Sequence, residues 1–282
     1  MIQIPANTVA IVGCGYVGTA LGAEWVRRGR DVLGTTTTPA RLAELQSLGI
    51  RPALVEIADC QRLHTLLADR DAVYLTVARG KQQRGYEAVY LAGVPNLSRA
   101  VDGTPVQRVI YTSSTSVYGQ NDGSWVDETS PTNPTNENGR ILLATERELL
   151  DGAQRAGASA VVLRLSGIYG PGRDPAGRLE RVAGQERSDG QTYVNLIHRD
   201  DIVEVMVRLL DSDFSGVMCL NNDRPILRCE LYDPLLAAAG LPPIRWRGDD
   251  QNPRGKRVRN DLMKRTLGLT LAHPEYEYPA GS

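Results

Sequence analysis

No apolar run in this 282-residue chain approaches the ~18–20 residues that a membrane-spanning helix needs. The first residues, "MIQIPANTVAIVG", lack a basic segment followed by a long apolar one and lead directly into an expected strand, so we expect no signal peptide. The cysteines and histidines are few and scattered, without the paired spacing of a metal site: Cys14, Cys60, Cys219, Cys229, His64, His198 and His273. We therefore expect reduced thiols, no metal, no membrane partner and a cytoplasmic location.

The chain also lacks an excess of charge of either sign. Its 32 Lys and Arg residues against 33 Asp and Glu residues give a net charge of -1 and a pI near 6.3. Nucleic-acid-binding domains usually carry a basic surface, so we do not expect nucleic acid as a partner. The length is sufficient for one large α/β domain, or for a nucleotide-binding domain with a small appendage.

Short apolar runs alternate with amphipathic segments through the first half of the chain. The runs typical of buried strands cover residues 8–13, 31–36, 51–58, 71–78, 106–114 and 159–167. Strands that alternate with helices predict parallel strands joined by right-handed crossovers, and hence an α/β fold with a doubly wound parallel sheet. We expect the nucleotide-binding part to cover residues 1–170. A smaller substrate lobe is expected over 171–282, partly returning to the sheet.

The segment "VAIVGCGYVGTALG" contains a G-x-G-x-x-G pattern directly after a strand and at the start of a helix. This context is typical of a dinucleotide-binding (Rossmann) loop, in which the helix N-terminus faces the pyrophosphate. Gly13 permits the tight turn, Gly15 lets a pyrophosphate approach the backbone, and Gly18 lets the helix pack close to the sheet. The predicted cofactor loop therefore comprises Gly13, Gly15, Tyr16, Val17 and Gly18.

The second strand lacks the acidic residue that usually holds the ribose 2′-hydroxyl of NAD, because no Asp or Glu occurs between Asp31 and Glu44. Thr35, Thr36 and Arg41 are suited instead to bind a 2′-phosphate, Arg41 by a charge-assisted contact. The alternative is that Arg41 only solvates the helix surface. The pattern favours NADP.

Five segments occur in an order and spacing that resemble one known family: "IVGCGYVG", "VIYTSSTSVYG", "VDETSPTNP", "LRLSGIYGPGR" and "VNLIHRDDIV". The chain resembles the extended short-chain dehydrogenases/reductases, in particular the NAD-dependent epimerase/dehydratase group and its branch of nucleoside-diphosphate-sugar epimerases. The resemblance covers roughly residues 8 to 210. It is much more specific for the fold than for the reaction.

The resemblance implies roles for single residues. Ser114 matches the hydroxyl that bonds the reacting substrate oxygen, although such a serine can also satisfy local backbone groups. Asp59 matches the position beside adenine. The residues that match the walls around the nicotinamide and its ribose are Thr76, Val77, Ala78, Ser166 and Ile168. The asparagine expected near Ser166 is replaced by Gly167, so one substrate contact is absent.

The family's catalytic tyrosine and the lysine four residues later are also absent: no Tyr or Lys occurs from Glu128 to Leu150. The same frame places Asn136 and Arg140 there. Arg140 remains charged and cannot relay a proton, so we expect it to hold a ribose or phosphate. Glu137 is the nearby candidate for proton transfer, with a solvated or helix-terminal carboxylate as the alternative. Tyr118 and Tyr169 are expected to be packing residues.

The C-terminal part should determine the substrate, since ligands of such sheets lie outside the carboxyl ends of the strands. Arg173, Arg178 and Asn195 are the candidate substrate residues, with simple solvation of the arginines as the alternative. We expect an oxidoreductase, epimerase or dehydratase that acts on a nucleotide-activated sugar and forms a homodimer. The other hypothesis is a non-catalytic NAD(P)-binding redox sensor or regulatory protein.

Overall fold

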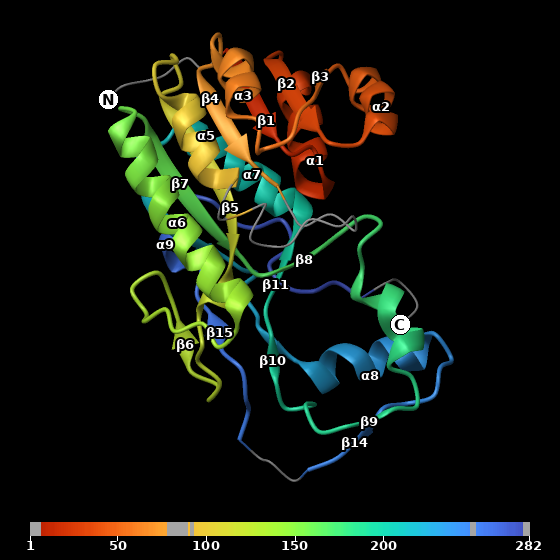
Figure 1. Cartoon of the computed structure of the whole chain (residues 1–282). Coiled ribbons are helices and arrows are strands. Elements are labelled where there is room, and N and C mark those ends of the chain that lie inside the picture. Colours follow the sequence, from red (N-terminus) through yellow and green to blue (C-terminus); the bar gives the residue numbers. More distant parts are fainter. Residues whose placement is uncertain (1–6, 78–89, 91–92, 249–251, 279–282) are drawn as a thin grey trace. The chain divides into compact units, whose positions relative to one another are not determined.

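The computed structural model describes residues 7–77, 90, 93–248 and 252–278 (Figure 1). The chain divides into two compact units. Unit 1 comprises Met1–Val117, Pro134–Arg164 and Ile202–Met218, and unit 2 comprises Tyr118–Asn133, Leu165–Asp201 and Cys219–Ser282. Residues from both sides of position 170 therefore occur in each unit.

A seven-stranded sheet forms the centre of unit 1, with the strand order β12-β7-β5-β4-β1-β2-β3. The strands from β5 to β3 are parallel to one another. The chain starts in the middle at β1, builds outward to β3, and then returns to build the other half, so the predicted doubly wound sheet is confirmed. The strands are β1 (Thr8–Val12), β2 (Asp31–Thr36), β3 (Arg51–Leu54), β4 (Ala72–Leu75), β5 (Arg108–Ser114), β7 (Ser159–Leu165) and β12 (Gly216–Leu220).

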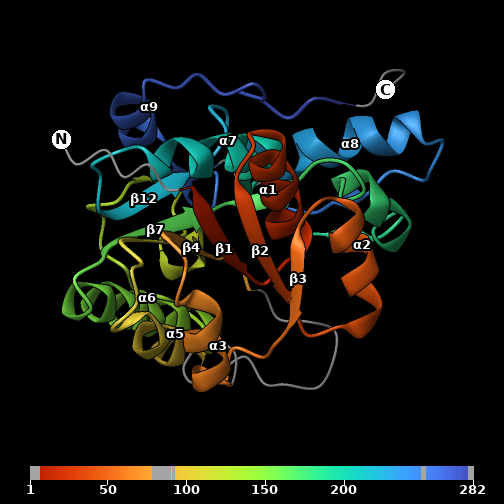
Figure 2. The same ribbon diagram turned by 90° about the horizontal axis from the view of Figure 1, so that it is seen from above.

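Helices cover both faces of this sheet, because its strands are apolar on both sides. Figure 2 shows α3, α5 and α6 on one side of the sheet and α1 and α7 on the other. The Trp25 ring of α1 lies 6.3 Å from that of Tyr74 in β4, whose hydroxyl donates to the Met206 carbonyl of α7. The helices are α1 (Tyr16–Arg27), α2 (Leu42–Ser47), α3 (Cys60–Leu67), α5 (Gly93–Val101), α6 (Glu137–Arg155) and α7 (Arg199–Leu210), with short 3-10 turns η1 (Pro39–Arg41) and η2 (Thr115–Val117).

Unit 2 is built from short strand pairs around its own apolar core. Each residue of this core exposes less than one tenth of its surface: Tyr169, Leu179, Leu196, Leu231, Leu235, Leu236, Ile244 and Tyr276. The strands and helices are β6 (Trp125–Val126), β8 (Gly167–Tyr169), β9 (Glu186–Arg187), β10 (Tyr193–Val194), β11 (Leu196–His198), β13 (Ile226–Leu227), β14 (Arg245–Trp246), β15 (Arg257–Val258), η3 (Pro175–Arg181), α8 (Arg228–Ala238) and α9 (Asp261–Leu267). The strands pair as β8 with β11, β6 with β15, β9 with β14 and β10 with β13.

The sequence pattern predicts six of the seven strands of the large sheet, and β12 is the one it does not reveal. Within the described ranges, no helix has both the length and the apolar character that crossing a bilayer requires.

Candidate functional site

The glycine loop between β1 and α1 has the backbone that its spacing predicts. Gly13 has a φ of +99°, which favours glycine, and a Cβ on it would lie 2.9 Å from the Val77 backbone. A Cβ on Gly18 would lie 2.5 Å from both the Gly13 carbonyl oxygen and the Thr76 Oγ1. These two glycines are therefore required by the packing of β1, β4 and α1.

Gly15 differs from its neighbours, because a Cβ there would meet no atom closer than 4.0 Å. The packing of the chain itself does not require glycine at this position. Gly15 is the N-cap of α1, where no side chain caps the helix and no acid occupies the first turn. The first turn of a helix offers N–H groups and a partial positive charge to a phosphate. This end of α1 fits the diphosphate of a dinucleotide.

The end of β2 supports the loop through Thr35. The Thr35 hydroxyl accepts from the Gly13 amide at 3.0 Å, and its carbonyl accepts from the Cys14 amide at 2.7 Å. Thr36 is buried as well, and its hydroxyl accepts from the Thr38 amide at 3.1 Å. Both threonine hydroxyls are engaged with backbone groups of the chain itself. Burial also raises the pKa of the Cys14 thiol to about 12, so it stays neutral.

Arg41 lies beside the glycine loop at the end of η1. Its Nη1 donates to the Cys14 carbonyl at 2.6 Å, and its Nη2 donates to the Thr19 hydroxyl at 3.1 Å. The same guanidinium pairs with Glu44, whose hydrogen bonds raise the pKa of Arg41. The side chain is 32% exposed, so part of its positive charge faces solvent beside the loop.

The ends of β3 and β4 carry the other predicted cofactor residues. Asp59 is the N-cap of α3, and its carboxylate accepts from the Arg62 amide at 2.9 Å. The Thr76 hydroxyl donates to the Gly13 carbonyl at 2.7 Å, next to Val77. Ala78 lies outside the described residues. The structure thus brings the loop, Thr35, Arg41, Thr76 and Val77 together at one edge of the sheet.

Ser114 ends β5, and its Oγ accepts a hydrogen bond from the Ser116 amide at 3.1 Å. This bond uses one of the two lone pairs of the Ser114 oxygen and does not involve the hydroxyl hydrogen, which can still donate. The following 3-10 turn lies against the start of α6, where a Cβ on Gly139 would meet the Ser116 carbonyl at 2.9 Å.

The stretch from Glu128 to Leu150, which has no tyrosine or lysine, leads into α6 and includes its first part. Asn136 is its N-cap, and its side chain accepts from the Gly139 amide at 2.9 Å. Glu137 and Arg140 pair with each other at 2.8 Å, with exposed fractions of 67% and 58%. The helix starts at Glu137 because Asn136 supplies the cap directly before it.

The two tyrosines that are expected to be packing residues, Tyr118 and Tyr169, are held by the fold of unit 2. The Tyr118 hydroxyl donates to the Asp127 carbonyl at 2.7 Å, and the Tyr169 hydroxyl donates to the Glu275 carbonyl at 3.1 Å. Burial raises the pKa of Tyr169 above its ordinary value. Both act as packing residues that join distant segments of unit 2.

The predicted substrate residues of unit 2 have different surroundings. Both polar atoms of the Asn195 side chain are engaged, because it donates to the Lys256 carbonyl at 2.8 Å and accepts from the Val258 amide at 2.9 Å. Arg178 lies within η3 and Arg173 lies two residues before it, and both are exposed. Ser166 is buried just before β8, which carries Ile168.

Two features of unit 2 escape the sequence analysis. Lys256 is partly buried, its Nζ donates to the Tyr118 carbonyl at 3.0 Å, and burial lowers its pKa. His198, Asp200 and His273 form a cluster of side chains whose types can ligate a metal ion. No spacing could reveal the cluster, because 75 residues separate its histidines.

The sequence profile of the "NAD dependent epimerase/dehydratase family" matches residues 9–218, well over half of the chain. The chain belongs to this family. Protein YeeZ of Escherichia coli K12 is 34% identical over 279 residues, which cover 96% of each chain. The dTDP-6-deoxy-L-talose 4-dehydrogenase (NAD(P)(+)) of Kitasatospora kifunensis is 25% identical over 203 residues, 67% of this chain and 61% of that protein.

A solved structure with a similar fold is the UDP-glucuronic acid 4-epimerase of Bacillus cereus, in complex with UDP-4-deoxy-4-fluoro-glucuronic acid and NAD. It shares 20% identity and a TM-score of 0.77, over 94% of each chain. This likeness agrees with the predicted fold. The expectation of an NAD-dependent epimerase, dehydratase or reductase is confirmed by the family and its members.

Proposed function

We propose that the protein uses NADP in preference to NAD and acts on a nucleotide-activated sugar as an oxidoreductase, epimerase or dehydratase. The observation that carries the cofactor preference is the position of Arg41. Its guanidinium is bonded to the glycine loop, and the end of β2 has no carboxylate to repel a 2′-phosphate.

The other cofactor residues complete this proposal. The uncapped start of α1 would receive the diphosphate at Gly15, Tyr16 and Val17. Asp59 would lie beside the adenine. The family resemblance also assigns Thr76, Val77, Ala78, Ser166 and Ile168 to the binding of the nicotinamide and its ribose.

The proposed substrate class rests on relatives and on charge. Among the relatives, the Bacillus cereus enzyme was solved with a UDP-sugar, and the Kitasatospora enzyme is named for a dTDP-sugar. The exposed Arg173 and Arg178 would supply positive charge for the substrate diphosphate. Asn195 would act through the backbone that it holds at β15 rather than by its own polar atoms, since these are already bonded.

When bound, the nicotinamide supplies hydride transfer to or from a substrate carbon. Ser114 would donate its hydroxyl hydrogen to the substrate oxygen. Arg140 would hold a phosphate or ribose, and Glu137, one turn away, would be the carboxylate able to exchange a proton. The absence of the tyrosine–lysine pair predicts slower acid–base catalysis than in relatives that have it.

The test is a thermal-shift matrix on the full chain, with NAD(H) and NADP(H) on one axis and UDP-, GDP-, dTDP- and CDP-sugars on the other. A ligand at one hundred times its Kd adds about 2.7 kcal/mol of stability. We expect a larger shift with NADP than with NAD, and a further shift with one nucleotide class, followed by product formation in chromatography. Cofactor stabilisation without any second response or turnover would favour the redox sensor instead. Equal shifts with NAD and NADP would contradict the cofactor preference.

A further inference from the structure

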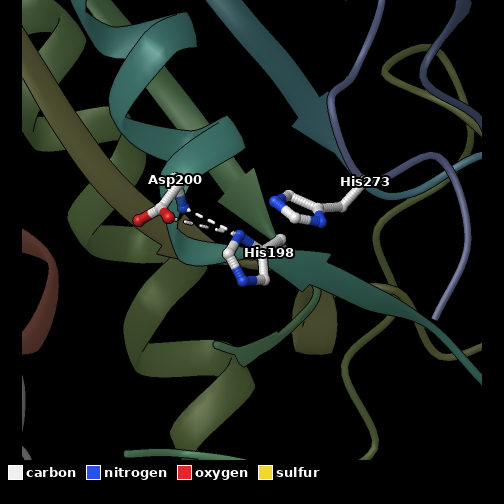
Figure 3. A group of neighbouring side chains, drawn as sticks. All are labelled: His198, Asp200 and His273. Atoms are coloured by element: carbon white, nitrogen blue, oxygen red, sulfur yellow. Dashed lines mark hydrogen bonds and ion pairs between the residues drawn. The ribbon is translucent and has the colours of Figure 1, made fainter. Parts of the chain in front are cut away.

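Three side chains that the proposed function does not use come together in unit 2. His198 is the last residue of β11, Asp200 lies in the first turn of α7, and His273 belongs to the segment after α9. Potential ligand atoms of the three all lie within 4.8 Å of one another. Figure 3 shows a ring nitrogen of His273 pointing toward the space beside Asp200 and His198.

His198 is fixed in a buried position. The residue is only 7% exposed, and its ring makes a T-shaped contact with that of Tyr169, with ring centroids 5.0 Å apart. Its Nδ1 accepts from the Asp200 amide at 3.2 Å and lies 3.9 Å from the Asp200 Oδ2. Zinc at this nitrogen would replace the Asp200 amide as the partner of the Nδ1 lone pair.

His273 is held in place by its own backbone and by a second carboxylate. The amides of Ala272 and His273 donate to the buried Asp201 carboxylate at 2.7 and 3.1 Å. The His273 Nδ1 lies 3.3 Å from the Glu277 Oε1. A carboxylate on one ring nitrogen is the usual partner of a metal-bound histidine, because it fixes the proton there and leaves Nε2 as the ligand.

Asp200 supplies an anionic ligand that can adjust. Its Oδ1 accepts from Arg199 at 2.9 Å, while Oδ2 faces His198. The side chain is 52% exposed, so it can rotate at little cost. A tetrahedral zinc ion with bonds of about 2.1 Å places its ligand atoms about 3.4 Å apart, so ligand atoms that now lie up to 4.8 Å apart need to close by as much as about 1.4 Å.

We propose that His198, Asp200 and His273 bind one Zn²⁺ ion, with water in the fourth position. Two imidazoles and one carboxylate are donors that suit zinc and related divalent transition metals better than Mg²⁺ or Ca²⁺. The ion fastens the segment around His273 to the junction of β11 and α7, where Asp201 already holds the same backbone. Glu277 acts as the positioning residue of His273.

The experiment uses the full chain after treatment with a chelator and desalting. Zinc chloride is added, and bound zinc is measured by equilibrium dialysis with elemental analysis; Co²⁺ replaces zinc for visible spectroscopy. We expect one ion per chain, a rise in melting temperature and a cobalt spectrum without a thiolate charge-transfer band. Binding of fewer than one zinc ion per chain at saturating zinc would overturn the proposal. A thiolate charge-transfer band, which indicates cysteine ligands, would overturn it as well.

Variants separate this site from adventitious binding. His273→Ala removes a ligand at a partly exposed position and should weaken zinc binding at least about 100-fold; Glu277→Gln should weaken it about 10–100-fold. The matched control is His64→Ala on α3. His64 is the one histidine of the sequence outside the cluster, and its Nδ1 lies 3.1 Å from the Ala100 carbonyl. It should bind zinc like the wild type. If His273→Ala folds poorly, Asp200→Asn serves in its place, and wild-type affinity in any ligand variant would refute the site.

Discussion

Glu146 and Arg164 form an ion pair within unit 1 whose side chains are only 2% and 6% exposed. The Arg164 guanidinium donates to both carboxylate oxygens at 2.8 to 3.2 Å, and Glu146 also accepts from the Ser113 hydroxyl. The pair joins α6 and β7 to the residue that precedes Ser114 in β5. Loss of one partner leaves a buried charge without compensation.

Glu146→Ala should therefore lower the free energy of unfolding by about 3–5 kcal/mol. Replacing both charged residues, as in Glu146→Leu with Arg164→Met, should recover most of this loss, because no charge then remains buried. Urea unfolding of the two variants measures the difference. A single variant as stable as the wild type would contradict the account, and the exposed pair Arg155–Glu148 provides a control, since Glu148→Ala should cost less than about 1 kcal/mol.

Gly15 and Gly18 of the cofactor loop should respond differently to substitution by alanine. Gly18→Ala places a Cβ 2.5 Å from two oxygen atoms and should cost about 1–3 kcal/mol of stability. Gly15→Ala meets nothing closer than 4.0 Å, so stability should change little while cofactor affinity falls. Thermal unfolding without ligand, together with titration of NADP(H) fluorescence, separates the effects. Unchanged cofactor binding by Gly15→Ala would show that the diphosphate lies elsewhere.

The sequence predicts well what depends on local pattern. The glycine loop and the strands β1 to β5 follow from short-range periodicity and turn residues. What it does not predict depends on distant segments meeting. The pattern around Thr35 cannot reveal that its hydroxyl is used by Gly13, and nothing near His198 indicates that His273 packs against it.

Arg41→Ala should weaken NADP binding by about tenfold or more, with less than a threefold effect on NAD. A charge-assisted hydrogen bond contributes about 1.5–3 kcal/mol, and only NADP carries the phosphate that would receive it. Isothermal titration with both cofactors measures the ratio. Arg27→Ala, at the opposite end of α1 and 70% exposed, is the control. An equal loss for both cofactors would mean that Arg41 only supports the loop through Cys14 and Thr19.

Asn136 offers a direct test of the missing acid–base pair. Asn136→Ala removes the cap that accepts from Gly139 and should cost about 1 kcal/mol. Asn136→Tyr with Arg140→Lys also loses the cap but restores the residue types of the family. Once a substrate is known, this double variant should turn over at least about tenfold faster than the wild type, since general acid–base catalysis typically contributes 10² or more. Arg140→Lys alone is the control and should give no gain.

Asp127 should make stability depend on pH. Its Oδ1 accepts from the hydroxyl and amide of Thr129 and from those of Ser130, and these bonds, the Thr129 hydroxyl first, lower the pKa of Asp127. Because the folded pKa lies below the unfolded value of about 3.9, the ionised carboxylate stabilises the fold above that value. This contribution is lost as the pH falls through the folded pKa. Asp127→Asn should therefore be less stable than the wild type at pH 6, and the gap should narrow toward pH 3.

Thr129→Val deletes the main donor, so its loss of stability relative to the wild type should also be smaller at pH 3 than at pH 6. Thr135→Val changes an exposed threonine nearby in the sequence, and its stability difference from the wild type should not depend on pH in this way. Urea unfolding at pH 6, 4 and 3 measures all three variants. A difference that stays constant or widens on acidification would mean that the Asp127 charge is not stabilised by this turn. The turn formed by "VDETSP" would then hold Tyr118 only through the Asp127 carbonyl, without help from the carboxylate.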